Sequence, residues 1–124
     1  MMERGNFPLG NRGEEIACRY LRQMGYEVLE RNFRCKIGEI DIVARDGKVT
    51  VFVEVKARKS KTYGKPKEAI SFHKQKKLVQ LAQYYMKKHH LFDTSARFDV
   101  IGIKWTENGR YNIELIQNAF DVES

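Results

Sequence analysis

The sequence predicts a single α/β domain, a mixed central β-sheet flanked by helices in the order α-β-β-β-α-β-β. Two segments, 11–24 and 72–89, space their apolar residues by three and four, as amphipathic helices do. Two pairs of alternating segments flank Asp-Gly and Asn-Gly turn signals, as in β-hairpins. A chain of 124 residues supports one hydrophobic core. We therefore expect a flexible tail over residues 1–9 and one domain over 10–124.

The first helix is expected over residues 11–24, with Asn11 as its N-cap and Gly25 as its stop signal. Its apolar stripe consists of Ile16, Ala17, Tyr20, Leu21 and Met24. Glu14 lies near this stripe, three residues before Ala17. Its carboxylate either closes a polar site against the sheet or only complements the positive end of the helix dipole.

An edge strand is expected over 26–32, followed by a hairpin with strands at 38–45 and 48–58. In the second hairpin strand valines alternate with Thr50, Phe52, Glu54 and Lys56. Because alternate side chains of a strand point to opposite faces, Glu54 and Lys56 share one face, about 6.5–7 Å apart.

The hairpin turn then determines where Asp41 lies. If Asp46-Gly47 forms a type I′ turn, Arg45 pairs with Lys48 and the numbers of every opposed pair sum to 93. Asp41 would then face Phe52 and lie diagonal to Glu54, about 7–8 Å away. A shift of one residue would move Asp41 to the other face of the sheet.

A basic connector, 59–67, contains Gly64 and Pro66 and leads to the second helix, which Ser71 is placed to cap. The apolar stripe of that helix consists of Leu78, Leu81, Ala82 and Tyr85. A last hairpin is expected over 97–104 and 111–116. Arg97 and Asp99 share parity and are expected to pair, and residues 118–120 to pack back on the core.

Asp41, Glu54 and Lys56 together suit metal-assisted phosphodiester hydrolysis. Mg²⁺ prefers hard oxygen ligands and binds through one or two carboxylates plus water and phosphate oxygens. A lysine beside them can position the attacking water or stabilise charge on the phosphate. Ionisable groups among valines are costly unless they are paired or bind metal. The alternative is that the three residues form a buried salt bridge.

Several motifs together resemble the small bacterial YraN-type family, over about residues 10–120. They are Gly13-Glu14-x-x-Ala17, Arg31-Asn32, Gly38-Glu39-Ile40-Asp41, Val53-Glu54-Val55-Lys56-x-Arg58, Arg97-Phe98-Asp99 and Asn118-Ala119-Phe120. That family is similar to the PD-(D/E)xK nucleases and to archaeal Holliday-junction resolvases, which implies a restriction-endonuclease-like fold. Ile40 stands where the signature has a proline, which many members lack.

The resemblance implies roles for individual residues. Asp41 and Glu54 match the metal-binding acids, with the main-chain carbonyl of Val55 as a further ligand of Mg²⁺ or Mn²⁺. Lys56 matches the catalytic lysine, and Glu14 matches the glutamate of the first helix. Junction-cutting relatives act as dimers, so a homodimer is a hypothesis to test.

The charge of the chain is uneven. Between residues 56 and 90 there are eleven Lys or Arg residues and one acid, Glu68, a local charge of +10 in a chain of net charge +7. This pattern favours a polyanionic partner, most simply DNA, although a solvated lysine-rich surface has the same composition. We assign nucleic-acid contacts to Arg58, Lys59, Lys61, Lys65, Lys74, Gln75 and Lys77.

Other functional classes fit the sequence poorly. The chain has no run of 18 apolar residues and no apolar segment near its start, so we expect a cytoplasmic protein without membrane contact. Cys18 and Cys35 lack the spacing of a zinc site, and the three histidines do not complete one.

The sequence thus predicts a Mg²⁺-dependent, endonuclease-like protein acting on structured or branched DNA. Three alternatives stay open: a DNA- or RNA-binding module that recruits a partner enzyme, an RNA-processing enzyme, and a structural partner protein without affinity for nucleic acid.

Overall fold

The structure, a computed structural model, describes residues 9–59, 70–91, 93–106 and 108–120. Within them the chain forms two helices and five strands in the predicted order. The elements are α1 (Leu9–Gln23), β1 (Glu27–Arg34), β2 (Glu39–Asp46), β3 (Val49–Lys59), α2 (Phe72–Lys88), β4 (Ala96–Trp105) and β5 (Tyr111–Ile116). Residues 1–8 of the predicted tail over 1–9, and the connector after Lys59, lie outside the described residues, whereas Leu9 belongs to α1 and not to a tail.

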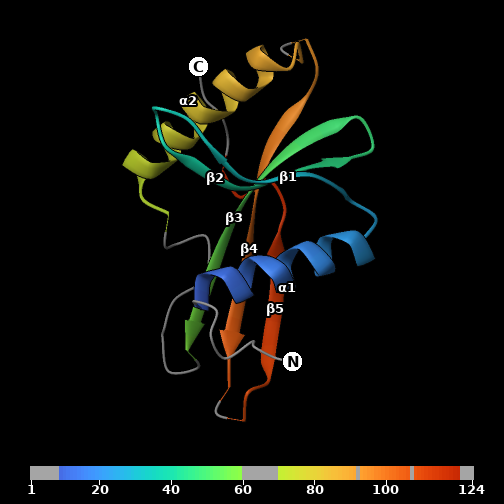
Figure 1. Ribbon diagram of the computed structural model, residues 1–124, viewed down its shortest axis with the longest axis vertical. Coiled ribbons are helices and arrows are strands. Elements are labelled where there is room, and N and C mark those ends of the chain that lie inside the picture. The colour runs from blue at the N-terminus through green and yellow to red at the C-terminus, as the bar shows by residue number, and fades with distance from the viewer. Residues whose placement is uncertain (1–8, 60–69, 92, 107, 121–124) are drawn as a thin grey trace.

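The five strands form one mixed sheet in the order β1-β2-β3-β4-β5 (Figure 1). β3 and β4 are parallel, as a strand–helix–strand crossover through α2 requires, and the other neighbours are antiparallel. β1 is an edge strand, as predicted. The α/β fold class is therefore confirmed.

Each helix packs its apolar stripe on a different face of the sheet, which gives two clusters of buried side chains. One cluster joins α1 to residues such as Ile42, Val53 and Ile101. The other joins α2 to residues such as Val43, Phe52 and Phe98, and the predicted α2 stripe is buried in it. The C-terminal segment packs on this second cluster, since the Ala119 N–H donates to the Phe98 carbonyl at 2.7 Å and Phe120 stacks on Phe98.

Two of the three predicted helix-end signals agree with the structure. Ser71 caps α2 by accepting a 3.1 Å hydrogen bond from the Lys74 N–H. Gly25 ends α1 with a φ of 95°, and the next N–H, of Tyr26, donates to the Leu21 carbonyl. The prediction for Asn11 is wrong, because α1 already begins at Leu9 and Asn11 lies within its first turn.

The predicted hairpin register is also wrong, by two residues. The loop is Gly47-Lys48, so Asp46 pairs with Val49 and Arg45 with Thr50 instead of Lys48. Gly47 has a φ of 63°, the left-handed conformation that a type II′ turn needs at its first central position.

Tertiary contact explains why Asp46 stays in β2. Its carboxylate accepts a 2.9 Å hydrogen bond from Arg97 of β4. In a type I′ turn Asp46 would itself sit in the loop with a positive φ. Because the shift is of two residues, the paired residues of β2, 42–46, keep the faces that the strand alternation predicts. The described helices include none long and apolar enough to cross a membrane.

Candidate active site

Asp41 lies where β2 separates from β3. The paired residues of the two strands end at Ile42 and Val53. Alternation also breaks here, because Ile40 and Val43 both pack in the α2 cluster while Ile42 packs in the α1 cluster. The Asp41 carboxylate accepts a 2.8 Å hydrogen bond from the Val55 N–H of β3. This bond ties Asp41 to the strand segment that carries Glu54 and Lys56.

Glu54 is buried and is held by two lysines. Lys74 of α2 places its Nζ 2.6 Å from Glu54 Oε2, and Lys56 places its Nζ 3.7 Å from the same oxygen. The side chain of Glu54 is only 8% exposed, so these ammonium groups replace most of its contact with water. The predicted pairing of Asp41 with Phe52 is wrong, because Phe52 pairs with Val43 and the pairing of β2 with β3 ends at Ile42 and Val53.

Glu14 reaches the same region from α1. A Cβ added at the preceding Gly13 would lie 3.5 Å from Ala57 Cβ and 3.7 Å from Val55 Cγ1, so this part of α1 rests directly on β3. One carboxylate oxygen of Glu14, Oε1, is buried and has no hydrogen-bond partner within the described part of the chain. A buried oxygen without a donor is costly, and a cation is one way to satisfy it.

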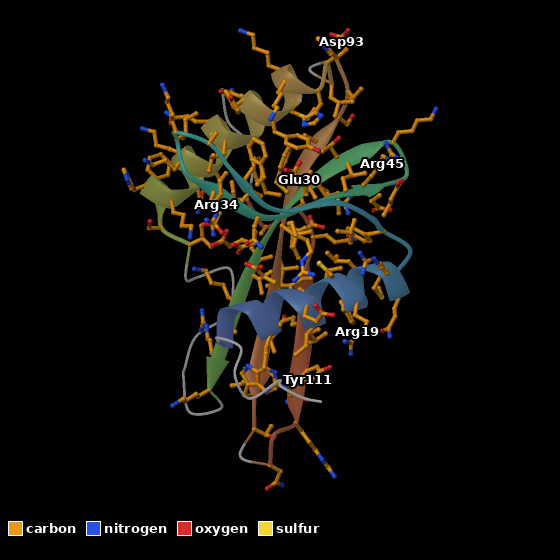
Figure 2. The ribbon with its side chains drawn as sticks, in the orientation of Figure 1. Arg19, Glu30, Arg34, Arg45, Asp93 and Tyr111 are labelled. Carbon is orange, nitrogen blue, oxygen red and sulfur yellow. The ribbon has the colours of Figure 1, made fainter. Side chains whose placement is uncertain are left out.

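Three carboxylates converge there: oxygens of Glu14, Glu39 and Asp41 all lie within 4.8 Å of one another. Ligands of Mg²⁺ lie about 2.1 Å from the ion, so oxygens across it are about 4.2 Å apart. The oxygen donors and their spacing therefore fit such an ion. Glu39 is exposed, and its Oε1 lies 3.6 Å from the Nε of Arg34, which is labelled in Figure 2.

Glu39 was not among the predicted site residues. The signal that would have identified it is its spacing, two residues before Asp41 on the same strand. The converging group of three does not include the predicted ligand Glu54, which is paired with Lys74. Asp41 is therefore the common member of two acidic groups, one with Glu54 and one with Glu14 and Glu39.

The electrostatics of Asp41 are unusual. Burial and then the negative charge of Glu54 raise the pKa of Asp41 to about 7, against the opposing effect of the Val55 N–H. Burial also raises the pKa of Glu14, although a hydrogen bond with Asn32 partly offsets this. For Lys74, burial lowers the pKa, but the hydrogen bond and charge of Glu54 outweigh it and the net shift is upward. Strongly perturbed carboxylates that face a lysine pair are typical of functional sites.

The predicted nucleic-acid contacts are distributed more widely. Arg58 and Lys59 lie at the end of β3, and Lys77 is exposed on α2. Gln75 donates from its side-chain amide to the Ile70 carbonyl at 3.1 Å, so it secures the start of α2. Lys61 and Lys65 lie outside the described residues.

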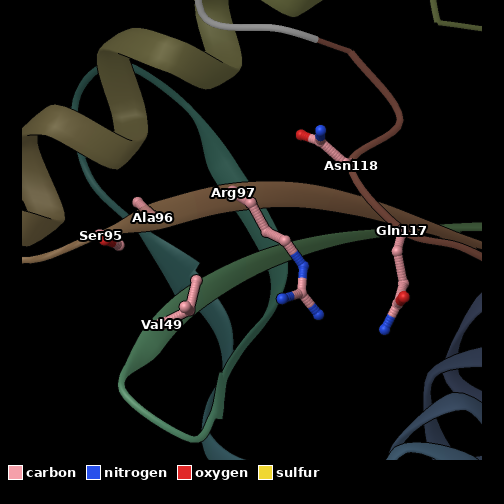
Figure 3. A pocket seen from close by; sticks show the side chains of 6 residues that line it. All are labelled: Val49, Ser95, Ala96, Arg97, Gln117 and Asn118. Atoms are coloured by element: carbon pink, nitrogen blue, oxygen red, sulfur yellow. The ribbon is translucent and has the colours of Figure 1, made fainter.

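A separate polar network surrounds Asp99, at the start of β4. Asp99 is buried and accepts hydrogen bonds from the Arg97 Nε, the Tyr26 hydroxyl and the Asn118 N–H at 2.9–3.0 Å. The predicted pairing of Arg97 with Asp99 is thus confirmed. Arg97 also lines an open pocket of about 450 Å³ with Gln117 and others (Figure 3). Because Arg97 is already paired with both Asp99 and Asp46, this pocket does not offer a free cation to an anion.

Comparison with known proteins places the chain in a family. A model described as "Uncharacterised protein family UPF0102" matches residues 13–103. A UPF0102 protein of Pelobacter propionicus is 50% identical over 115 residues, which are 91% of this chain and 82% of the relative. A relative of the same name from Caldicellulosiruptor saccharolyticus is 48% identical over 90% of this chain and 96% of its own length. Another, from Clostridium kluyveri, is 48% identical over 94% of this chain and 97% of its own length.

Proposed function

This chain belongs to the UPF0102 family, and from its site we propose that it is a divalent-metal-dependent endonuclease that hydrolyses phosphodiesters in structured or branched DNA. The observation that carries the proposal is the placement of Asp41. Its carboxylate is partly buried, accepts a hydrogen bond from the Val55 N–H and has its pKa raised by the charge of Glu54, which itself is paired with two lysines. The motifs shared with PD-(D/E)xK nucleases include these same residues.

In this proposal Asp41 and Glu54 hold Mg²⁺ or Mn²⁺, together with the main-chain carbonyl of Val55. When bound, the ion supplies Lewis-acid activation of the phosphate and lowers the pKa of a ligand water. Glu14 orients the ion or the water, and its unpartnered buried oxygen supports that role. Glu39 joins this group because its carboxylate lies beside those of Glu14 and Asp41.

The two lysines take different roles. Lys56 follows Glu54 on β3, and its Nζ lies 3.7 Å from the carboxylate, so it is placed to position the attacking water. Lys74 neutralises Glu54 in the absence of metal. Its ammonium would be available to a phosphate oxygen of the substrate in a form of the protein in which Glu54 served as a metal ligand.

A nicking assay tests the proposal. Four-way junctions, flaps and single strands are incubated with Mg²⁺ or Mn²⁺, and product lengths are resolved by electrophoresis. The wild type is expected to cut at least one branched substrate, and Asp41→Asn and Glu54→Gln to lose that activity. Glu27→Gln, at an exposed ion pair with Arg45, is the matched control. An active Asp41→Asn enzyme would refute the assignment of roles.

The second candidate function is a nucleic-acid-binding module without catalysis. The 2.6 Å ion pair between Lys74 and Glu54 favours it, because the pair already satisfies the buried carboxylate without any metal. This alternative predicts salt-dependent binding of DNA or RNA that needs no divalent cation. Calorimetric titration with Mn²⁺ separates the two: heat of binding that Asp41→Asn abolishes supports the nuclease, and no heat supports the module.

A further inference from the structure

The face of α2 that points away from the sheet is basic and carries no acid. The helix contains five lysines and no Asp or Glu among its 17 residues. Four of them, Lys76, Lys77, Lys87 and Lys88, are exposed. In Figure 2 side chains with nitrogen at their tips extend outward from this helix. Such a surface is complementary to a phosphate backbone.

An aromatic ring stands at the start of this basic face. Phe72 is the first residue of α2, and it is 72% exposed, although the helix buries other apolar side chains against the sheet. The Nζ of Lys76 lies 5.2 Å from the centre of the Phe72 ring, one helical turn further on. An exposed ring beside lysines is the arrangement that proteins use to stack bases of single-stranded nucleic acid.

Phe72 lies close to the candidate active site along the helix axis, but on another side of α2. Lys74, two residues after Phe72, lies about 3 Å further along the axis and about 200° around it, where it bonds Glu54 while Phe72 stays exposed. A strand whose phosphate lies at the carboxylates would therefore have to continue around the start of α2 to bring a base to Phe72.

We propose that the first two turns of α2 bind an unpaired strand next to the scissile phosphate, with Phe72 stacked on a base and Lys76 and Lys77 on phosphates. The inference rests on the proposed function and narrows its substrate class to DNA with unpaired nucleotides beside the cut. In an intact duplex the base faces are covered by neighbouring base pairs, so only an unpaired base offers a face to Phe72. The positive charge of α2 would also suit an acidic protein as a partner, and the test below distinguishes that partner from a nucleic acid.

The test measures binding in EDTA, where no metal-dependent cleavage occurs. A single-stranded oligonucleotide carrying 2-aminopurine and a blunt duplex of the same length are titrated with the full chain. Phe72→Ala is expected to weaken single-strand binding about 5- to 150-fold, the range for loss of one stacked base, and duplex binding less than twofold. Phe72→Trp is expected to restore it. Met24→Ala, which removes an apolar side chain that is also exposed, is the control.

Salt dependence separates stacking from charge. Lys76→Gln and Lys77→Gln are each expected to reduce the slope of log affinity against log salt by about 0.7, and Phe72→Ala to leave it unchanged. Lys48→Gln, an exposed lysine in the β2–β3 loop, is the matched control and should not change the slope.

Two results would overturn the inference. In the first, the Phe72→Ala variant binds the single strand as tightly as the wild type. In the second, the wild type binds polyglutamate but neither oligonucleotide. Phe72-dependent binding by a protein that cuts nothing would refute the proposed nuclease and leave standing only the binding of an unpaired strand by α2. Cleavage that does not depend on Phe72 would support the nuclease and refute the role of Phe72.

Discussion

The Val55 N–H donates a 2.8 Å hydrogen bond to Asp41 Oδ2, where a main-chain carbonyl of β2 would accept it if the strands stayed paired. In a two-residue hairpin the pair flanking the loop, Asp46 and Val49, exchanges both hydrogen bonds, and so does every second pair beyond it. Continued pairing would match Ile40 with Val55. The carboxylate thus replaces that carbonyl, so Asp41 supports the sheet as well as the site.

Replacing Asp41 should separate its charge from its hydrogen bond. Burial raises the pKa of Asp41 from 3.8 to about 7, so the folded protein binds a proton at this carboxylate more tightly than the unfolded chain does. The contribution of Asp41 to the free energy of unfolding therefore falls as pH rises from about 4 to about 7. Asp41→Asn keeps an acceptor for Val55 and should be more stable than wild type near pH 8 without metal. Asp41→Ala leaves the Val55 N–H without its acceptor and should lose about 1–3 kcal/mol.

Urea unfolding at about pH 4 and about pH 8, in EDTA, measures these differences. The stability advantage of Asp41→Asn over wild type should be present only at the higher pH. An equal effect of the Asn and Ala substitutions at both pH values would contradict the importance of the charge.

Metal affinity should depend steeply on pH. A cation requires the ionised form of Asp41, whose pKa is about 7, so below that value the affinity for Mn²⁺ should rise about tenfold per pH unit and then level off. Calorimetry in two buffers with different heats of ionisation should detect at least one proton released per ion bound at about pH 6. Glu14, with a raised pKa, adds to this release, and Glu14→Gln should reduce it.

Lys74 is expected to compete with metal. Lys74→Met removes the ammonium 2.6 Å from Glu54, so the metal-free protein should lose about 1–3 kcal/mol, the cost of leaving a buried charged group with fewer partners. The same substitution should tighten Mn²⁺ binding, because no ion pair has to be broken. Lys77→Met, on the exposed side of the same helix, should change neither quantity. Weaker Mn²⁺ binding by Lys74→Met would contradict this competition.

Asp99 should matter for stability and not for metal binding. Asp99→Ala removes the partner of Arg97 and of the Tyr26 hydroxyl and should cost about 3–5 kcal/mol, typical of a broken buried pair. Glu27→Gln, at an exposed pair of 2.6 Å with Arg45, should cost less than about 1 kcal/mol. Both are measured by urea unfolding, and Mn²⁺ affinity of the folded variants should match wild type. A loss under 1 kcal/mol for Asp99→Ala would mean that the network is not stabilising.

Much of this arrangement could be predicted from local patterns. Helical spacing identified α1 and α2, and the Asp-Gly and Asn-Gly signals located the two hairpins, because backbone periodicity and turn chemistry depend on neighbouring residues. Strand alternation predicted that Glu54 and Lys56 share a face, and Lys56 Nζ lies 3.7 Å from Glu54 Oε2. Asp41 lies beyond the last paired residues, so its position beside β3 follows from its hydrogen bond with the Val55 N–H and not from the predicted register.

Contacts between residues far apart in the chain set the rest. Asp46 remains in β2 because Arg97, 51 positions later in the chain, donates a hydrogen bond to its carboxylate. Rules for turn sequences consider neighbouring residues only and cannot predict that bond. Glu39 joins Glu14 only where α1 rests on β3, and Lys74 meets Glu54 only after α2 crosses back over the sheet. The membership of the site is therefore a property of packing, because its acidic side chains come from α1, β2 and β3 and its Lys74 from α2.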